Sequence, residues 1–481
     1  MKPLPKGLLV VVTAGTVIFF LAGMPLVSDV AGWFYRPVDR PIHAVALAVV
    51  FGAVVPPVLV VVVRLARRGR HGWAMTLAVV CAWCAQLAFS FVGGPGLDEV
   101  WRRHVEGHGE LLRVAHDRRG AMLETLRDYD RLAAEGELGS FARSKPPGAL
   151  LVYGMMEAVA EAPPVAVFLE PLAADARRNP RLAPVARTAA LSLLLMPLLT
   201  ALVLPALLLL SRKLLRERAA GHGAAILFMT CPAVLLISYH LDGALYPLVS
   251  VGACALLAAG TRDDRYVLSV LAGAVLSVGL YVTFSLLPAV PLSVGALLLV
   301  AVDRVHREPT QAVWQRAGFH LAAAAAGFVA VLFVLVSPLG YEPLARFEAA
   351  MQHHALWKAA VPTGTWRAMA LVEFSLYAGV PLMAAFLWRV GAGALRMTRR
   401  SPSPADPFAF GLLALLLVLS AVAGTNEAAR MWMFLLPFVA LATASDLGGT
   451  ATEEGTWWRP LAWLAGAQAL LALAMKTSQV W

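Results

Sequence analysis

Long apolar stretches separated by short polar connectors set the pattern of this 481-residue chain. Most of the stretches hold about 18 to 25 residues, enough for a helix to cross a hydrocarbon core of roughly 30 Å. Lipid offers no hydrogen-bond partners to the backbone, so stretches of this kind must be helical. The pattern therefore predicts an all-α fold, a polytopic transmembrane helical bundle of about 13 spans.

The apolar stretches divide the chain into three parts. We expect spans near residues 8–28, 42–63, 73–93, 185–210, 222–239, 244–260, 266–281, 286–302, 317–337, 369–388, 407–423, 431–446 and 460–475. Residues 1–93 then hold three N-terminal helices, and 94–183 form a long external segment with interfacial helices. Residues 184–481 form the remaining bundle, with a second external loop at 338–368.

Composition and charge support a membrane protein and argue against a nucleic-acid-binding protein. Hydrophobic residues make up 59% of the chain and the mean hydropathy is +0.71, whereas soluble proteins hold roughly 45–50% apolar residues. The net charge of +10 comes with basic clusters in short connectors, at Arg64–Arg70, Arg212–Arg218 and Arg389–Arg400. Because positive charge marks cytoplasmic loops, this distribution predicts a membrane topology and no nucleic-acid partner.

The same distribution predicts orientation and localisation. Lys2 and Lys6 precede the first apolar run, no small-residue cleavage site follows it, and we read it as a retained helix with a cytoplasmic N-terminus. An odd number of spans places the C-terminus outside. Arg outnumbers Lys and Ala is abundant, as in GC-rich bacterial genomes, so we expect a multi-pass protein of the bacterial cytoplasmic membrane.

Two short motifs open and close the long external segment. Asp98-Glu99 directly follows a span, and Lys145-Pro146-Pro147 directly precedes the return to apolar sequence. A carboxylate at the membrane surface suits a general base; the alternative is an acidic pair that complements a helix dipole. The Lys145 ammonium, on a backbone stiffened by two prolines, offers three donors to a phosphate; the alternative is a lysine that snorkels to lipid headgroups.

Together these motifs resemble the GT-C superfamily of polyprenyl-phosphate-sugar-dependent glycosyltransferases. The likeness is to the lipid A aminoarabinose transferases and the protein O-mannosyltransferases, whose first large external loop opens with Asp-Glu. That loop closes with Lys-Pro-Pro or His-Pro-Pro and a helix that contains an aromatic residue, here Tyr153. This chain departs from the family pattern in two extra spans before the loop and in Gly148, where Leu is common.

Further polar residues gather on the side predicted to be external. They are His240 and Asp242 at the end of one span, and Glu427 and Arg430 between two later spans. Charges this close to hydrocarbon mark functional sites, and a structural Glu427–Arg430 ion pair is the alternative reading.

The histidines raise the question of a metal site. His104 and His108 lie one helical turn apart, a spacing that suits two ligands of a divalent metal. No carboxylate or cysteine motif completes a ligand set, so no metal or other cofactor is required, and a divalent metal stays open.

The resemblance implies an inverting glycosyltransferase. Its donor would be a polyprenyl-monophosphate-linked sugar at the outer face, its acceptor a lipid, glycan or protein, and membrane lipids its surroundings. The implied catalytic carboxylates are Asp98 and Glu99, donor-phosphate ligands are Lys145, Arg430 and Tyr153, and supporting residues are Arg102, His240, Asp242 and Glu427. Two alternatives remain: a transporter or flippase of an anionic lipid or glycan, and a ligase or polymerase of undecaprenyl-diphosphate glycans.

Overall fold

The computed structural model describes most of the chain. The described residues are 6–22, 57–58, 60–66, 68–91, 97–105, 109–216, 218–237, 239–305, 307–358, 363–399, 403, 405–423, 427–448 and 458–478. Within them the secondary structure is helical throughout, as the apolar pattern predicts. Helices α1 (Lys6–Leu21) and α3 (His71–Phe89) are the first and third expected spans. The second, 42–63, lies largely outside the described residues.

The long polar segment folds into a chain of short helices. They are α4 (Leu97–Val105), α5 (Gly109–Asp117), η1 (Arg119–Ala121), α6 (Met122–Arg127), α7 (Tyr129–Glu135), η2 (Phe141–Ser144), α8 (Gly148–Ala160) and α9 (Pro163–Ala176). Gly136 ends α7 with a φ of +85°, a left-handed conformation that glycine adopts without steric cost. Pro163 begins α9, which turns away from α8 by 98°.

The rest of the chain forms the bundle. Its elements are η3 (Ala183–Val185), α10 (Ala186–Ala201), α11 (Val203–Leu214), α12 (Arg218–Met229), α13 (Pro232–Ile237), α14 (Leu241–Asp263), α15 (Tyr266–Val282), η4 (Phe284–Leu286), α16 (Ala289–Val305), α17 (Thr310–Leu339), α18 (Pro343–Lys358), α19 (Thr363–Ala378), α20 (Val380–Thr398), α21 (Ala405–Ala423), α22 (Ala428–Met431), η5 (Met433–Leu435), α23 (Leu436–Gly448) and α24 (Trp458–Ser478).

Across all described residues, six helical runs are long and apolar enough to cross a membrane. The number rises to eight if each of two bent pairs of helices is one span. The chain is a helical membrane protein, and its described residues do not reach the thirteen spans expected. Residues 369–388 were expected to form one span, and the structure shows two helices there in place of a continuous one. The helix breaks at Gly379, whose φ is +94°, and α20 leaves α19 at 106°.

The span expected at 222–239 is not one continuous helix either. Helix α12 ends at Met229, and α13 begins at Pro232. Proline has no N–H to continue the ladder of the preceding turn, so the helix is interrupted there.

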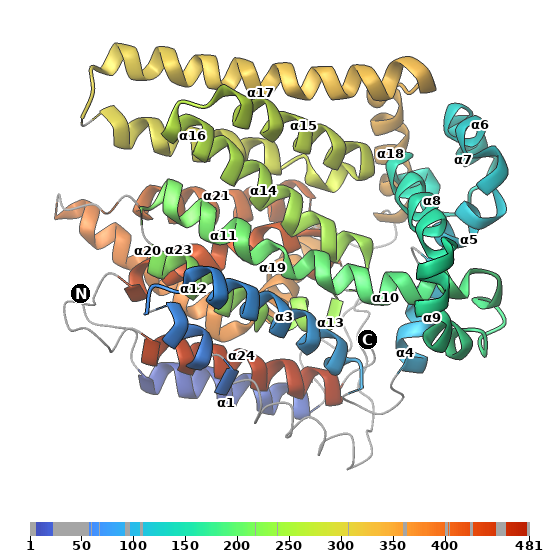
Figure 1. Ribbon diagram of the computed structural model, residues 1–481. Helices are drawn as coiled ribbons and strands as arrows, with labels where there is room; N and C mark the ends of the chain where they lie inside the picture. Colours follow the sequence, from blue (N-terminus) through green and yellow to red (C-terminus); the bar gives the residue numbers. More distant parts are fainter. Residues whose placement is uncertain are drawn as a thin grey trace.

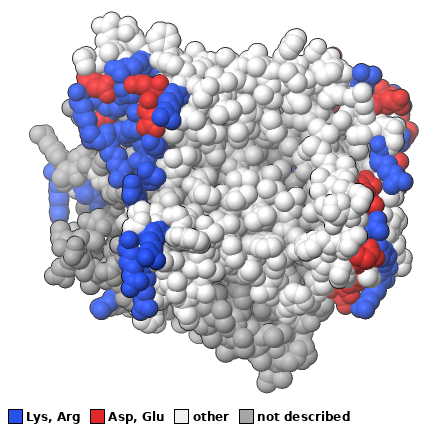
Figure 2. All heavy atoms as spheres, viewed as in Figure 1, with Lys and Arg blue, Asp and Glu red and all other residues white. Residues whose placement is uncertain are grey.

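The charged side chains lie at two ends of the molecule. Figure 2 shows Lys, Arg, Asp and Glu at two opposite edges of the visible face, with a broad band of other residues between them. In Figure 1, α4–α9 and α18 gather at one of these ends, while α17 lies along the edge of the bundle. Charged groups avoid hydrocarbon, so the uncharged band is the part that a bilayer would surround.

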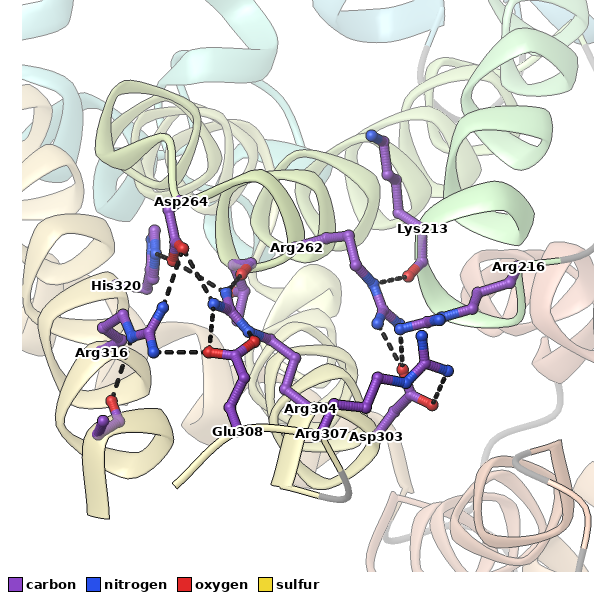
Figure 3. Close-up of polar contacts among 12 residues, drawn as sticks. Lys213, Arg216, Arg262, Asp264, Asp303, Arg304, Arg307, Glu308, Arg316 and His320 are labelled. Atoms are coloured by element: carbon purple, nitrogen blue, oxygen red, sulfur yellow. Dashed lines mark hydrogen bonds and ion pairs between the residues drawn. The ribbon is translucent and has the colours of Figure 1, made fainter. Parts of the chain in front are cut away.

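The other end carries a dense group of ion pairs (Figure 3). Arg304 contacts Asp264 at 2.9 Å and Glu308 at 2.8 Å, and Arg316 contacts both of these carboxylates. The hydrogen bonds from Arg304 lower the pKa of Asp264 to about 2. These contacts fasten the ends of α14, α16 and α17 together at the end of α14 away from Asp242, about 31 Å along the helix.

A labelling experiment checks the orientation of the two ends. In a variant without native cysteines, Glu124→Cys on α6 and Arg307→Cys beyond α16 are both exposed positions. An impermeant maleimide added to whole cells should label the Glu124→Cys variant and leave the Arg307→Cys variant unlabelled until the cells are broken. The reverse pattern would place the Lys145 region in the cytoplasm and remove the basis for a donor in the outer leaflet.

Candidate functional site

A buried tyrosine, Tyr129, contacts the backbone of the Lys145-Pro146-Pro147 turn. Lys145 has extended backbone angles, φ −118° and ψ 150°, because a following proline disfavours the helical region. The hydroxyl of Tyr129 lies near two backbone carbonyl oxygens of the turn, 3.2 Å from that of Lys145 and 3.5 Å from that of Pro146, and 3.3 Å from that of Ala142 just before it. The phenol thus supports the turn together with the backbone hydrogen bond from the Lys145 N–H to the carbonyl oxygen of Ala142.

Helix α18, from the loop expected at 338–368, contacts the same turn from another side. Arg346 is buried, donates a hydrogen bond to the carbonyl oxygen of Arg143, and contacts Asp130 at 3.1 Å. Its guanidinium also lies over the ring of Tyr129, 5.9 Å from the centroid. Two segments that are about two hundred residues apart in sequence thus jointly position Lys145.

Gly148, directly after the turn, packs where no side chain fits. A Cβ atom placed on Gly148 would lie 2.3 Å from the carbonyl oxygen of Tyr281, which is backbone and cannot move aside easily. The close approach of α15 therefore excludes a leucine at this position, where the family that the motifs resemble commonly has one.

This contact leads to a stability prediction. Gly148→Ala should lower the free energy of unfolding by roughly 1–3 kcal/mol or more, as overpacking does, measured by thermal unfolding in detergent. Gly154→Ala on the same helix is the matched control, because its Cβ would meet only the flexible end of Met122. Equal melting temperatures for the two variants would contradict the tight contact at Gly148.

The Lys145 side chain lies in a buried polar cluster. Its ammonium donates to both carboxylate oxygens of Asp242, each at 3.2 Å, and to the hydroxyl of Tyr246 at 3.2 Å. Asp242 and Tyr246 are four residues apart at the start of α14, so they share one face of the helix. The Tyr246 hydroxyl also bonds to Thr283 at 2.7 Å. We call Lys145, Asp242, Tyr246 and Arg430 the Lys145 cluster.

Arg430 enters the cluster from the short helix α22. Its Nε lies 3.8 Å from Asp242, and its Nη2 donates to Glu427. Glu373 of α19 is buried and accepts the backbone N–H of Ala428 at 3.0 Å. Its Oε1 has no hydrogen-bond partner among the described residues. The bent helix α19 thus anchors the segment that presents Arg430.

The charges of the cluster are balanced only when the neighbouring Glu427, which pairs with Arg430, is counted with it. Lys145 and Arg430 supply two positive charges, and Asp242 and Glu427 supply two negative ones. Burial would lower the pKa of Lys145, but the Asp242 carboxylate and the Tyr246 hydroxyl hold the pKa above its ordinary value. The lysine is therefore a buried cation with three donors, and an incoming anion competes with Asp242 for it.

The structure brings some predicted residues to this cluster and leaves others apart. Tyr153 is buried on α8, the helix that begins directly after the Lys145 turn. His240 lies two residues before Asp242, at the N-terminus of α14. Asp98 is exposed on α4, a helix that packs against α5 and α10. No described contact joins Asp98 to the cluster, and Asp242 is the carboxylate that touches Lys145.

Four other predicted residues fall near Asp98 or outside the described side chains. Arg102 is exposed on α4, and the side chain of Glu99 is not described. His104 is buried, with its Nδ1 2.8 Å from the carbonyl oxygen of Val100. His108 lies outside the described residues. Among those that are described, no three His, Cys, Asp or Glu side chains come together as a metal site.

Sequence reasoning missed three residues of this region. Tyr246 could have been found from its spacing to Asp242, since a residue four positions later lies on the same helical face. Glu373 sits within an expected span, where a carboxylate marks a functional position. Thr283 carried no sequence signal, since it is one polar residue near the end of an apolar run.

Comparisons of the chain with protein-family models, with curated proteins and with solved structures found no match to it.

Proposed function

We propose that the chain is a membrane glycosyltransferase that takes a sugar from a polyprenyl-monophosphate donor at the outer face of the membrane. The observation that carries the proposal is the Lys145 cluster, which gathers two cations from residues 145 and 430 around one buried carboxylate. Positive groups held in a buried, water-poor place suit a lipid phosphate, because there they interact strongly with an anion.

The proposed reaction increases the charge that these cations face. The donor is a phosphodiester with one negative charge, and the leaving group is a phosphate monoester with about −1.5 to −2. As the bond from the sugar C1 to the phosphate oxygen breaks, its electron pair goes to that oxygen. Lys145 and Arg430 then stabilise the transition state more than the donor, which is the condition for raising the rate.

In this proposal a carboxylate removes the proton of the acceptor hydroxyl. The acceptor oxygen then attacks C1 from the face opposite the phosphate, and the configuration at C1 inverts. We assign this role to Asp98, supported by Glu99, because the resemblance implies it and because Asp98 is exposed on α4, which packs on α5 and α10, the helices that pack on α8. Asp242 then positions Lys145 before the donor binds, while Tyr153, His240 and Glu427 line the surroundings of the cluster.

A flippase for an anionic lipid is the second candidate, and one observation favours it. Broken helices near a binding site are typical of transporters, and α19 and α20 meet at a 106° bend on the segment that anchors Arg430. In that case the same cations would bind the lipid phosphate without any bond being cleaved. The third candidate, a ligase or polymerase, requires a diphosphate-linked glycan.

One assay separates these candidates. The purified chain is reconstituted in vesicles with a polyprenyl-monophosphate hexose or with a polyprenyl-diphosphate oligosaccharide, and released polyprenyl phosphates are measured. A transferase should release polyprenyl monophosphate from the first donor and nothing from the second. Turnover of the diphosphate donor alone would indicate a ligase, and movement of the intact lipid across the bilayer without cleavage would indicate a flippase.

A further inference from the structure

An apolar groove runs between α1 and α24, away from the Lys145 cluster. Its volume is about 810 Å³, within the roughly 300–1,000 Å³ of small-molecule sites. Thr13 and Arg459 are its polar lining residues, and the others are apolar, aromatic or glycine. The Thr13 hydroxyl donates to the carbonyl oxygen of Leu9 at 2.7 Å. A hydrocarbon chain therefore fits the wall of the groove, whereas a polar ligand would find few hydrogen bonds.

The groove has a cation, Arg459, at one end. That end is the end of the molecule at which α12 begins with Arg218. Helix α24 runs beside α12 in the same direction, because Leu461 lies next to Gly223 and Gln468 lies next to Thr230. Arg459, at the start of α24, is therefore level with the start of α12 at Arg218. Arg459 is exposed there.

The length of the groove matches one leaflet of a bilayer. Its lining on α24 extends from Arg459 to Leu470, which is about 17 Å of helix at 1.5 Å per residue. Half of a hydrocarbon core of roughly 30 Å is about 15 Å. The groove thus reaches from the membrane surface to the midplane.

We propose that this groove binds one acyl chain of an anionic phospholipid in the leaflet at the Arg459 end, with the lipid phosphate against the Arg459 guanidinium. The apolar lining favours a hydrocarbon chain, and the length of the groove matches the depth that this chain reaches in one leaflet. The cation at the mouth favours an anionic headgroup. The site does not depend on the proposed transferase activity.

Lipid retention tests the proposal. The protein is incorporated into vesicles of equal parts phosphatidylglycerol and phosphatidylcholine, extracted in mild detergent, and its bound lipids are measured by native mass spectrometry. The wild-type chain should retain phosphatidylglycerol preferentially. Arg459→Gln should reduce that retention about fivefold, as the loss of one cation at an anionic surface does, and leave phosphatidylcholine unchanged. Equal retention of both lipids by the wild-type chain would overturn the headgroup contact.

A second pair of variants tests the groove itself. Gly466→Leu adds a side chain into the groove, and a Cβ at this position meets nothing within 4 Å, so the helix should fold. It should lower retention of both lipids. Gly15→Leu on α1 is the control, because Gly15 is equally open but does not line the groove. Wild-type retention by Gly466→Leu would overturn the proposal, as would a dimer that it converts to monomer, which would identify a second copy as the occupant.

Discussion

Lys145→Ala should lower turnover of a polyprenyl-monophosphate donor by about 10²- to 10³-fold, the usual cost of removing one donor that stabilises developing negative charge. The ammonium contacts Asp242 and Tyr246 in a buried place, so no water replaces it with equal strength. Lys145→Arg should restore part of the activity, because a guanidinium keeps the charge but has a different reach and shape.

Two controls separate this loss from unfolding. Removing the lysine takes one cation away from the buried Asp242, which keeps its contact with Arg430 at 3.8 Å, so a lower melting temperature is expected and must be measured beside activity. Arg131→Ala, an exposed basic residue of the same external segment, should change neither. Lys145→Ala with wild-type turnover and a wild-type Michaelis constant for the donor would contradict a role at the phosphate.

Asp98→Asn should lower turnover by about 10²- to 10⁴-fold, because the amide keeps the size of the side chain and loses its basicity. Expression and melting temperature should stay unchanged, since Asp98 is exposed. Glu99→Gln should cost less if Glu99 has a supporting role. Asp117→Asn, which changes another exposed carboxylate of the same segment, should have no effect.

The outcome for Asp98 also decides the role of Asp242. If Asp98→Asn turns over donor at the wild-type rate, Asp98 is not the base, and Asp242 becomes the carboxylate to test. Asp242→Asn removes the charge between two cations, and breaking such a buried arrangement typically costs about 3–5 kcal/mol in stability. A variant that is destabilised but keeps its pH–rate profile would show that Asp242 positions Lys145 and does not take the proton.

The helical class of the fold and the approximate positions of several long helices could be predicted from the sequence. The long apolar stretches identified the helices because a helix pairs the backbone N–H and C=O groups of each segment within the segment itself, as lipid requires. The breaks could not be placed this way: Gly379 lies within an apolar run, and only its left-handed conformation and the neighbouring Gln468 show where the chain turns.

The candidate site was partly predictable for a similar reason. Lys145, Asp242 and Arg430 were each singled out as charged residues near hydrocarbon, and the structure brings them together. Their mutual contact could not be derived, because it depends on the packing of α14 and α22 against the turn at Pro146. Asp98 was grouped with Lys145 by a motif pair, whereas its helix packs elsewhere.

The most direct test of the account is a structure of the chain with polyprenyl monophosphate bound. We predict that a phosphate oxygen lies within about 3–4 Å of the Lys145 ammonium, that Arg430 turns toward the same phosphate, and that the contact between Lys145 and Asp242 lengthens. A phosphate bound elsewhere, with Lys145 still held by Asp242 and Tyr246, would contradict the assignment of this cluster to the donor.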